Sequence, residues 1–321
     1  MNVLITGANG YIGRALTDRL LALRRLPDGR PIDSLTLFDQ RFDEPPSEDD
    51  ARVIEGSISC AETRNRLAAT APDVVFHLAS VASGRAQTDF ELGLQVNLYG
   101  TLGLLDALRQ QGNNPVFVFT SSIAVFGTHL PELVTDATPP APELSYGAQK
   151  RALEILLADY TRRGFVQGRA VRLPGIVMRP PAPNGAWSIF SSTLIRSLAT
   201  QQPCTLPVSP DATLWLMSLP CCIDNLLHAG VVRSHDPMTL TLPALRVSVA
   251  DIVNVFDQRT DGQARSLVRY EPQPDIQAQF GSLPLLETPA ALAAGFRHDG
   301  SLAELIDRAT EPLHTTPSFP R

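Results

Sequence analysis

The first half of the chain alternates short apolar runs with amphipathic segments. Runs with the length and composition of β-strands cover residues 3–5, 35–38, 52–55, 73–79, 115–120 and 169–173. Several of the segments between them place apolar residues on one face of a helix, as in residues 12–23 and 90–111. Strands that alternate with helices form a parallel sheet, and an almost wholly apolar strand such as 73–79 is typical of its centre. We therefore expect an α/β fold, with a Rossmann-type doubly wound parallel sheet over residues 1–175.

After residue 175 the alternation becomes irregular. We expect strands at residues 214–217 and 238–242, and helices at residues 222–232, 248–259, 289–296 and 301–309. Ser248 is the expected N-cap of its helix. A smaller C-terminal lobe is expected from residues 176–221 and 244–310, with residues 222–243 returning to the first domain. The proline- and threonine-rich end, residues 311–321, is expected to be a flexible tail.

Composition and charge narrow the function without defining it. Of the 321 residues, 44% are hydrophobic and 19% are charged, as in ordinary globular proteins. The net charge of −6 provides no basic surface, so we expect neither a nucleic-acid partner nor a membrane partner. The four cysteines lack C-x-x-C spacing and the six histidines lack H-x-x-x-H spacing, so no metal site is predicted. The N-terminus does not resemble a leader and no apolar run has membrane-spanning length, which predicts a cytoplasmic location.

A glycine-rich turn connects the first predicted strand to the first predicted helix. Gly7, Gly10 and Gly13 follow the pattern G-x-x-G-x-x-G. Glycines at such a turn let backbone amides approach a pyrophosphate, and the N-terminus of the helix adds a partial positive charge. The turn therefore predicts a dinucleotide site, to which Asn9, Tyr11 and Ile12 also belong.

Asp39 stands at the carboxyl end of the strand 35–38. At that place an acidic side chain accepts hydrogen bonds from the hydroxyls of an adenosine ribose, and its charge repels a 2′-phosphate. The sequence therefore favours NAD over NADP. Arg14, directly after the glycine turn, and Arg41, two residues after Asp39, leave NADP as the alternative.

Tyr146 and Lys150 are four residues apart and share one face of a predicted helix, for which Ser145 is the expected N-cap. A tyrosine has a pKa near 10 and is a poor base at neutral pH, but a nearby ammonium group lowers that pKa. This spacing is common on helix surfaces, and it indicates catalysis only because the chain also carries a predicted dinucleotide site. With Ser122 to hold the substrate oxygen, the pair indicates removal of an alcohol proton while a hydride passes to a cofactor.

Taken in order, these motifs resemble those of the extended short-chain dehydrogenase/reductases, in the NAD-dependent epimerase/dehydratase branch. The resemblance rests on the glycine turn, Asp39, residues 77–79, residues 121–127 and the Tyr146–Lys150 pair. It implies NAD as the cofactor and Ser122, Tyr146 and Lys150 as the catalytic triad.

The same resemblance implies further cofactor contacts. Lys150 would hold the nicotinamide ribose, Pro174 and Ile176 would contact the nicotinamide, and Ser57 and Ile58 would flank the adenine. The expected set is completed by Leu78, Ala79, Ser80 and Asn97. From the sequence alone, a surface position for Asn97 and a place near the site both stay open, whereas His77, within an apolar run, is expected to fill the core.

Several stretches, among them residues 145–150 and 214–218, are similar to the D-erythronate 2-dehydrogenases. This similarity implies NAD-dependent oxidation of the C2 hydroxyl of a four-carbon sugar acid to its 2-oxo acid, with the C-terminal lobe binding the substrate. The substrate follows from the resemblance alone. Candidate substrate contacts are Ser80, Ser83, Ser122, Tyr146, Arg179, Asn184 and Trp215. Members of the family often pair through the helices corresponding to residues 90–111 and 145–161, which implies a homodimer.

Two other functions stay open at this point, a nucleotide-sugar 4-epimerase and an NAD-sensing scaffold protein, whereas a sugar dehydratase is disfavoured. A nucleotide-sugar 4-epimerase uses the same triad and returns the hydride to the sugar, but such enzymes commonly carry an asparagine where this chain has residues 172–175, Arg-Leu-Pro-Gly. A sugar dehydratase carries Thr-Asp-Glu where this chain has Ser-Ser-Ile at residues 121–123. An NAD-sensing scaffold protein of the same fold often lacks the tyrosine–lysine pair, which is retained here.

Overall fold

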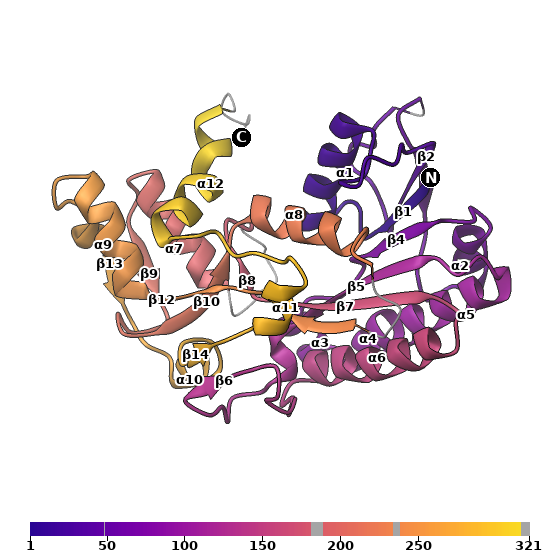
Figure 1. The fold of residues 1–321 in the computed structure, drawn as a ribbon. Coiled ribbons are helices and arrows are strands. Elements are labelled where there is room, and N and C mark those ends of the chain that lie inside the picture. Colours follow the sequence, from indigo (N-terminus) through magenta and orange to yellow (C-terminus); the bar gives the residue numbers. More distant parts are fainter. Residues whose placement is uncertain (48, 181–188, 234–237, 316–321) are drawn as a thin grey trace.

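The computed structural model describes residues 1–321 except 48, 181–188, 234–237 and 316–321. Its larger part is a seven-stranded sheet with the strand order β11-β7-β5-β4-β1-β2-β3 (Figure 1). The strands are β1 (Asn2–Thr6), β2 (Ser34–Asp39), β3 (Arg52–Glu55), β4 (Val74–His77), β5 (Val116–Ser122), β7 (Gln167–Leu173) and β11 (Met238–Thr241). All these strands pair in parallel, so the expected Rossmann-type sheet is confirmed. The chain leaves β1 toward β2 and β3 and returns to its other side at β4.

Helices cover both faces of this sheet because alternate strand residues point to opposite sides. The helices are α1 (Tyr11–Leu23), α2 (Ala61–Ala68), α5 (Thr101–Gln111), α6 (Ser145–Arg162) and α8 (Leu219–Ala229). Val3 and Ile5 pack into one core with α1 and α8, whereas Leu4 packs into another with α2, α5 and α6. Figure 1 shows α1 and α8 above the sheet and α5 and α6 below it.

The predicted helix over residues 90–111 is continuous, but its middle is a π-helix. α4 (Phe90–Gly93) leads into the π-helix η1 (Leu94–Gly100), which leads into α5. A π-turn inserts an extra residue into the helical repeat and is often found at functional sites. Here η1 carries Asn97, whose side chain is buried.

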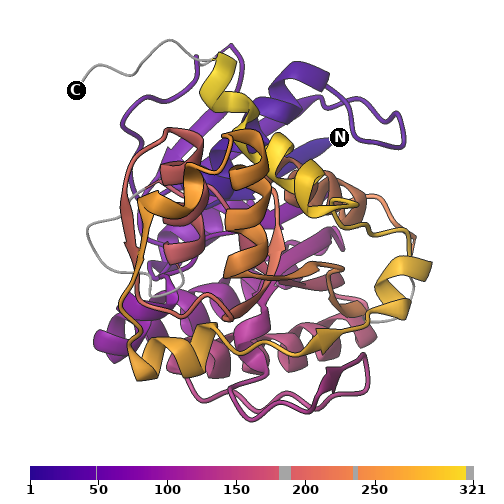
Figure 2. The same cartoon turned by 90° about the vertical axis from the view of Figure 1, so that its left-hand side faces the viewer.

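The second lobe has its own smaller sheets. A three-stranded sheet has the order β12-β10-β8, and two pairs join β13 to β9 and β14 to β6. These strands are β6 (Leu133–Val134), β8 (Gly175–Ile176), β9 (Cys204–Leu206), β10 (Thr213–Met217), β12 (Leu245–Ser248), β13 (Val268–Tyr270) and β14 (Leu285–Leu286). The helices α7 (Phe190–Ala199), α9 (Val249–Arg259) and α12 (Leu302–Thr315) share one apolar core, and they lie in front of the large sheet in Figure 2.

The ends of the helices test the sequence predictions. Ser248 caps α9 in a reciprocal capping box with Asp251, so that prediction is confirmed. The N-cap prediction for Ser145 is wrong, because Ser145 is the first residue of α6 and its backbone N–H is bound by the side chain of Gln87 at 3.0 Å. α12 extends to Thr315, past the start of the predicted tail. Within the described part of the chain, none of the helices combines the length and apolar composition that a membrane span requires.

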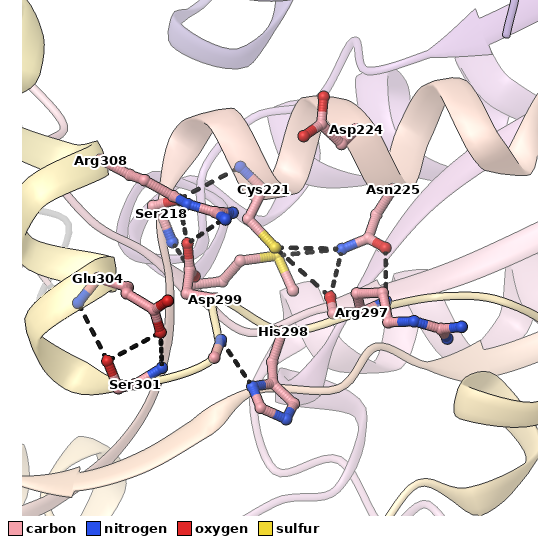
Figure 3. Close-up of polar contacts among 12 residues, drawn as sticks. Ser218, Cys221, Asp224, Asn225, Arg297, His298, Asp299, Ser301, Glu304 and Arg308 are labelled. Carbon is pink, nitrogen blue, oxygen red and sulfur yellow. Dashed lines mark hydrogen bonds and ion pairs between the residues drawn. The ribbon is translucent and has the colours of Figure 1, made fainter.

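The C-terminal segment is bound to the start of α8. Asp299, which is buried, accepts hydrogen bonds from the backbone N–H and the hydroxyl of Ser218, and Arg308 lies 3.8 Å from its carboxylate (Figure 3). The amide of Asn225 donates to the carbonyl of Arg297 at 2.8 Å. Ser218 follows β10, whose last residue pairs with Ile176 of β8. These contacts therefore join the C-terminal segment to the strand that carries Ile176.

Candidate active site

Three connected cavities open at the carboxyl edge of the large sheet. The Asp39 cavity is lined by the glycine turn, Asp39 and residues that include Ser57, Ile58, Leu78, Ala79 and Ser80. The Lys150 cavity is lined by residues that include Gly13, Tyr11, Ile12, Ser122, Tyr146, Lys150, Pro174, Ile176 and Arg179. The Glu143 cavity lies toward the second lobe and is lined by residues that include Ser83, Ser122, Thr128, Glu143, Tyr146, Pro174, Arg179 and Gln279.

The cavities are joined by shared walls. The Asp39 and Lys150 cavities share Gly7, Gly10, Leu78 and Ser80. The Lys150 and Glu143 cavities share Ser122, Tyr146, Pro174 and Arg179. One end of this channel therefore meets the glycine turn, and the other meets the second lobe. In open α/β sheets, ligands bind in this crevice beyond the carboxyl ends of the strands.

The glycine turn has the shape that a dinucleotide requires. Gly7 has φ 74°, and a Cβ there would lie 2.6 Å from the backbone nitrogen of Ala79. A Cβ at Gly13 would lie 2.1 Å from the carbonyl oxygen of Gly7, so the turn, β4 and α1 pack with backbone against backbone. α1 begins at Tyr11 with no side-chain cap and no acidic residue in its first turn. Its N-terminal amides and their partial positive charge are suited to a pyrophosphate.

Asp39 is held beside this turn. Its carboxylate accepts the backbone N–H of Asn9 at 2.8 Å and that of Gln40 at 2.7 Å. The two arginines that left NADP open have other partners: Arg14 binds Asn9 at 2.7 Å, and Arg41 binds Asp43 at 2.8 Å. The negative charge of Asp39 thus faces the cavity, which suits a ribose with free hydroxyls.

α6 presents Tyr146 and Lys150 to the Lys150 cavity from its first two turns. The ammonium of Lys150 donates to the carbonyl of Thr120 at 2.8 Å and lies 5.4 Å from the ring centre of Tyr146. Burial lowers the pKa of Lys150 to about 7, although the charge of Glu154 opposes that shift. Ser122, at the end of β5, accepts the backbone N–H of Ala124 at 3.1 Å.

The pKa of Tyr146 lies above its ordinary value, whereas the sequence predicted a lowered one. Burial raises it, while the charge of Arg179 and a hydrogen bond with Ser80 lower it. The sequence assigned the lowering to Lys150, whose ammonium is directed to the carbonyl of Thr120. Arg179 is therefore an electrostatic neighbour of the tyrosine that the sequence pattern did not identify in that role.

A buried ion pair lies behind the triad. Arg172 binds the carboxylate of Glu154 through two hydrogen bonds of 2.8 Å, and Ser121 donates to the same carboxylate at 2.6 Å. The side chain of Glu154 is 0% exposed and that of Arg172 is 9% exposed. Sequence reasoning missed this pair. The available signal was an acidic residue one turn after Lys150, on a helix face that is otherwise apolar.

Asn97 is not a surface residue. Its side-chain oxygen accepts the backbone N–H of Val81 at 2.7 Å and the hydroxyl of Ser80 at 3.1 Å, and its amide donates to Gln149 at 2.8 Å. It therefore shapes the loop that lines the Asp39 cavity. His77 fills the core as expected: it is bonded to Thr6 and Thr101, and burial lowers its pKa to about 3.

The substrate candidates divide into three groups. Ser83 and Arg179 line the Glu143 cavity with Ser122 and Tyr146, and Ser80 lines the two neighbouring cavities. The prediction for Trp215 is not supported, because its indole is buried against Phe126 and donates to the carbonyl of Pro284 at 2.8 Å. Asn184 lies outside the described residues. Sequence reasoning missed Thr128, Glu143 and Gln279, of which Glu143 had a signal in its nearness to Tyr146.

The comparisons with known proteins identify the family. The model of the NAD dependent epimerase/dehydratase family matches residues 3–213, and the chain belongs to this family. The expected cofactor, NAD, is thereby confirmed, and the glycine turn and Asp39 fit it.

Relatives match over nearly the whole chain. The chain is 39% identical to a D-erythronate dehydrogenase of Cupriavidus necator, over 95% of this chain and 97% of the relative. It is 33% identical to a D-erythronate dehydrogenase of Haemophilus influenzae, over 97% and 99% respectively. Its structure is similar to that of the nucleoside-diphosphate-sugar epimerase from Agrobacterium tumefaciens, with a TM-score of 0.90 and 35% identity over 97% of this chain and 94% of that one.

Proposed function

We propose that this protein is an oxidoreductase that oxidises the C2 hydroxyl of D-erythronate to 2-oxo-erythronate with NAD. The observation that carries the proposal is the wall shared by the Lys150 and Glu143 cavities, formed by Ser122, Tyr146, Pro174 and Arg179. A cofactor on one side and an acid on the other would meet there. The full-length similarity to two D-erythronate dehydrogenases supports the choice of acid.

The roles of the side chains follow from their chemistry. NAD, when bound, accepts the hydride from C2. Tyr146, as the phenolate, takes the proton of the C2 hydroxyl, and Ser122 orients that hydroxyl. Lys150 stabilises the phenolate and holds the nicotinamide ribose. Arg179 binds the carboxylate of the acid, for which a guanidinium is well suited because it offers paired donors.

The rest of the channel has corresponding roles in this proposal. The glycine turn with Asn9, Tyr11 and Ile12 binds the pyrophosphate, Asp39 the adenosine ribose, and Ser57 and Ile58 the adenine. Residues 1–175 with 222–243 form the NAD-binding domain, and residues 176–221 with 244–310 form the substrate lobe.

We also propose a homodimer in the cytoplasm. Phe90, Tyr99 and Ile155 are exposed on α4, η1 and α6, the helices for which the family resemblance implied pairing, and burial of such apolar surface favours association. The described cysteines are free thiols, which suits a reducing compartment.

The proposal is tested by the near-ultraviolet absorbance of NADH, with purified protein, NAD and D-erythronate. L-threonate in place of the acid and NADP in place of NAD serve as controls. Tyr146→Phe should keep NAD binding and lose activity by about 10²- to 10⁴-fold, because the phenyl ring cannot take a proton. Tyr160→Phe is the matched control, since Tyr160 lies on the same helix but packs on Phe165 away from the channel.

An active Tyr146→Phe variant would contradict the role of Tyr146. A wild-type protein that binds NAD and leaves every four-carbon acid unchanged would contradict the reaction. The second candidate is a nucleotide-sugar 4-epimerase, which the similarity to the Agrobacterium tumefaciens protein favours. Tightly retained NAD and conversion of a nucleotide sugar without net NADH would identify it.

A further inference from the structure

The Glu143 cavity carries two opposite charges. Among the residues that line it, Arg179 is the cationic one and Glu143 the anionic one. Arg179 also lines the Lys150 cavity, whereas Glu143 lines the side toward the second lobe alone. Within the described part of the chain, Glu143 contacts His129, which is charged only when protonated, and no ion pair joins Glu143 to Arg179. The charge along the cavity is therefore positive at Arg179, near Tyr146, and negative at Glu143, on the side away from the cofactor.

The carboxylate of Glu143 is held in place and stays ionised. Thr128 donates its hydroxyl to one carboxylate oxygen, and Nδ1 of His129 lies 2.6 Å from the other. The hydrogen bonds from Thr128 and His129 hold the pKa of Glu143 below its ordinary value. Its side chain is 39% exposed. An ionised carboxylate accepts further hydrogen bonds, so it has capacity left for a ligand hydroxyl.

Another part of the wall comes from a distant part of the chain. α10 (Pro274–Phe280) contributes Gln279 to the same cavity. The pairing of β14 with β6 brings this segment beside the loop that carries Thr128 and Glu143 (Figure 1). A carboxylate and a primary amide that line one cavity both suit hydroxyl groups, which donate to the first and exchange hydrogen bonds with the second.

We propose that Glu143 determines specificity, by accepting a hydroxyl at the end of the acid remote from its reacting carbon and by excluding a second carboxylate there. The inference rests on the proposed function, because it takes Arg179 as the partner of the first carboxylate. The substrates are then hydroxy acids with one carboxylate and a terminal hydroxyl. Dicarboxylic acids of the same length are excluded, because two carboxylates close together repel each other.

Two natural probes isolate this effect. D-erythronate and meso-tartrate share the configuration at the reacting carbon and differ in the fourth carbon, which is a hydroxymethyl group in one and a carboxylate in the other. The wild-type enzyme should therefore prefer D-erythronate. Glu143→Gln removes the charge and keeps the shape, with its one oxygen able to accept from His129 and its NH₂ group able to donate to the hydroxyl oxygen of Thr128. It should raise kcat/KM for meso-tartrate relative to that for D-erythronate by about tenfold.

The control is Glu132→Gln, which makes the same charge change at an exposed residue of the loop between β5 and α6. It should leave the ratio unchanged. With D-erythronate, Glu143→Gln should raise KM by several-fold and leave kcat nearly unchanged, because the residue binds the remote end and takes no part in proton transfer.

The outcomes separate the inference from the proposed reaction. If D-erythronate is oxidised and the ratio of kcat/KM for the two acids is the same in wild type and Glu143→Gln, the inference is overturned. The proposed reaction is then unaffected. If neither acid is oxidised, calorimetric titration of the NAD-loaded protein with each acid decides. Binding of D-erythronate by the wild type, with meso-tartrate bound only by Glu143→Gln, would support the inference while the reaction fails. If wild type and Glu143→Gln show no difference in how they bind the two acids, the inference is overturned.

Discussion

Replacing Glu154 by glutamine should destabilise the fold and disturb the site together. The carboxylate accepts four hydrogen bonds, one from Ser121, two from Arg172 and one from Arg151. A glutamine of the same shape offers one oxygen and one NH₂ group in place of two oxygens. The NH₂ group then lies against N–H groups of Arg172 or Arg151, and no hydrogen bond can form between two donors. The Arg172 guanidinium loses its counter-charge in a place where water cannot replace it.

The magnitude follows from this burial. Removing one member of a buried ion pair costs about 3–5 kcal/mol of unfolding free energy, because the remaining charge is left without a partner. The matched surface pair is Arg269 with Glu271, 2.9 Å apart with side chains 77% and 56% exposed. Glu271→Gln there should cost less than about 1 kcal/mol. The double variant Glu154→Gln with Arg172→Met should cost less than the sum of the single variants, since it removes both charges.

Urea unfolding followed by circular dichroism measures these differences. Burial raises the pKa of Glu154, but the hydrogen bonds and charge of Arg172 outweigh burial and hold it below its ordinary value. A carboxyl with a lowered folded-state pKa stabilises the fold above its unfolded-state pKa, and this contribution disappears as the pH falls through the lowered value. The difference between wild type and Glu154→Gln should therefore be full at neutral pH and shrink in acid.

The reasoning is refuted if Glu154→Gln costs no more than Glu271→Gln at neutral pH. A second readout concerns Lys150, whose pKa is lowered by burial, a shift that the charge of Glu154 opposes. Loss of that charge should move the alkaline limit of activity to lower pH, because Lys150 then loses its proton more easily. An unchanged alkaline limit would show that the pair has no electrostatic role in the site.

Two further changes test the cofactor end of the channel. Gly13→Ala places a methyl group 2.1 Å from the carbonyl oxygen of Gly7, and since backbone atoms cannot yield as side chains do, it should weaken NADH binding by at least about tenfold in a fluorescence titration. Unaltered binding would mean that the turn does not hold the dinucleotide. Asp39→Asn keeps the size of the side chain, gives up one of its two backbone hydrogen bonds and removes the charge, and it should raise the NADP-to-NAD ratio of kcat/KM by about tenfold. A constant ratio would place the 2′-phosphate elsewhere.

Much of the fold was predictable because it depends on local pattern. Strand β4 could be located from its apolar run, the first helix from apolar residues three and four apart, and the N-cap Ser248 from its place before an amphipathic helix. The error at Ser145 has a tertiary cause. The side chain of Gln87 binds the backbone N–H of Ser145, so a partner from another helix stands where local reasoning expected the serine itself.

The candidate site was predictable to a smaller extent. Tyr146 and Lys150 were visible through their helical spacing, and the glycine turn through its pattern. Trp215 was misassigned because an aromatic residue near the end of a strand can face either the channel or the core, and its neighbour Phe126 lies far away in the sequence. Asn97 is buried on the π-helix η1, and the spacing of apolar residues in the sequence does not distinguish a π-helix from an α-helix.

By itself, the sequence determined the class of fold, the dinucleotide turn and the tyrosine–lysine pair, because each depends on spacings within one strand, turn or helix. Only the tertiary structure decided that Glu154 meets Arg172, that burial raises the pKa of Tyr146 while Arg179 opposes this shift, and that Glu143 lines the same cavity as Gln279. Those contacts join segments that are distant along the chain. The sheet topology and the packing of the second lobe bring these segments together, and neither produces a local pattern in the sequence from which the contacts could be predicted.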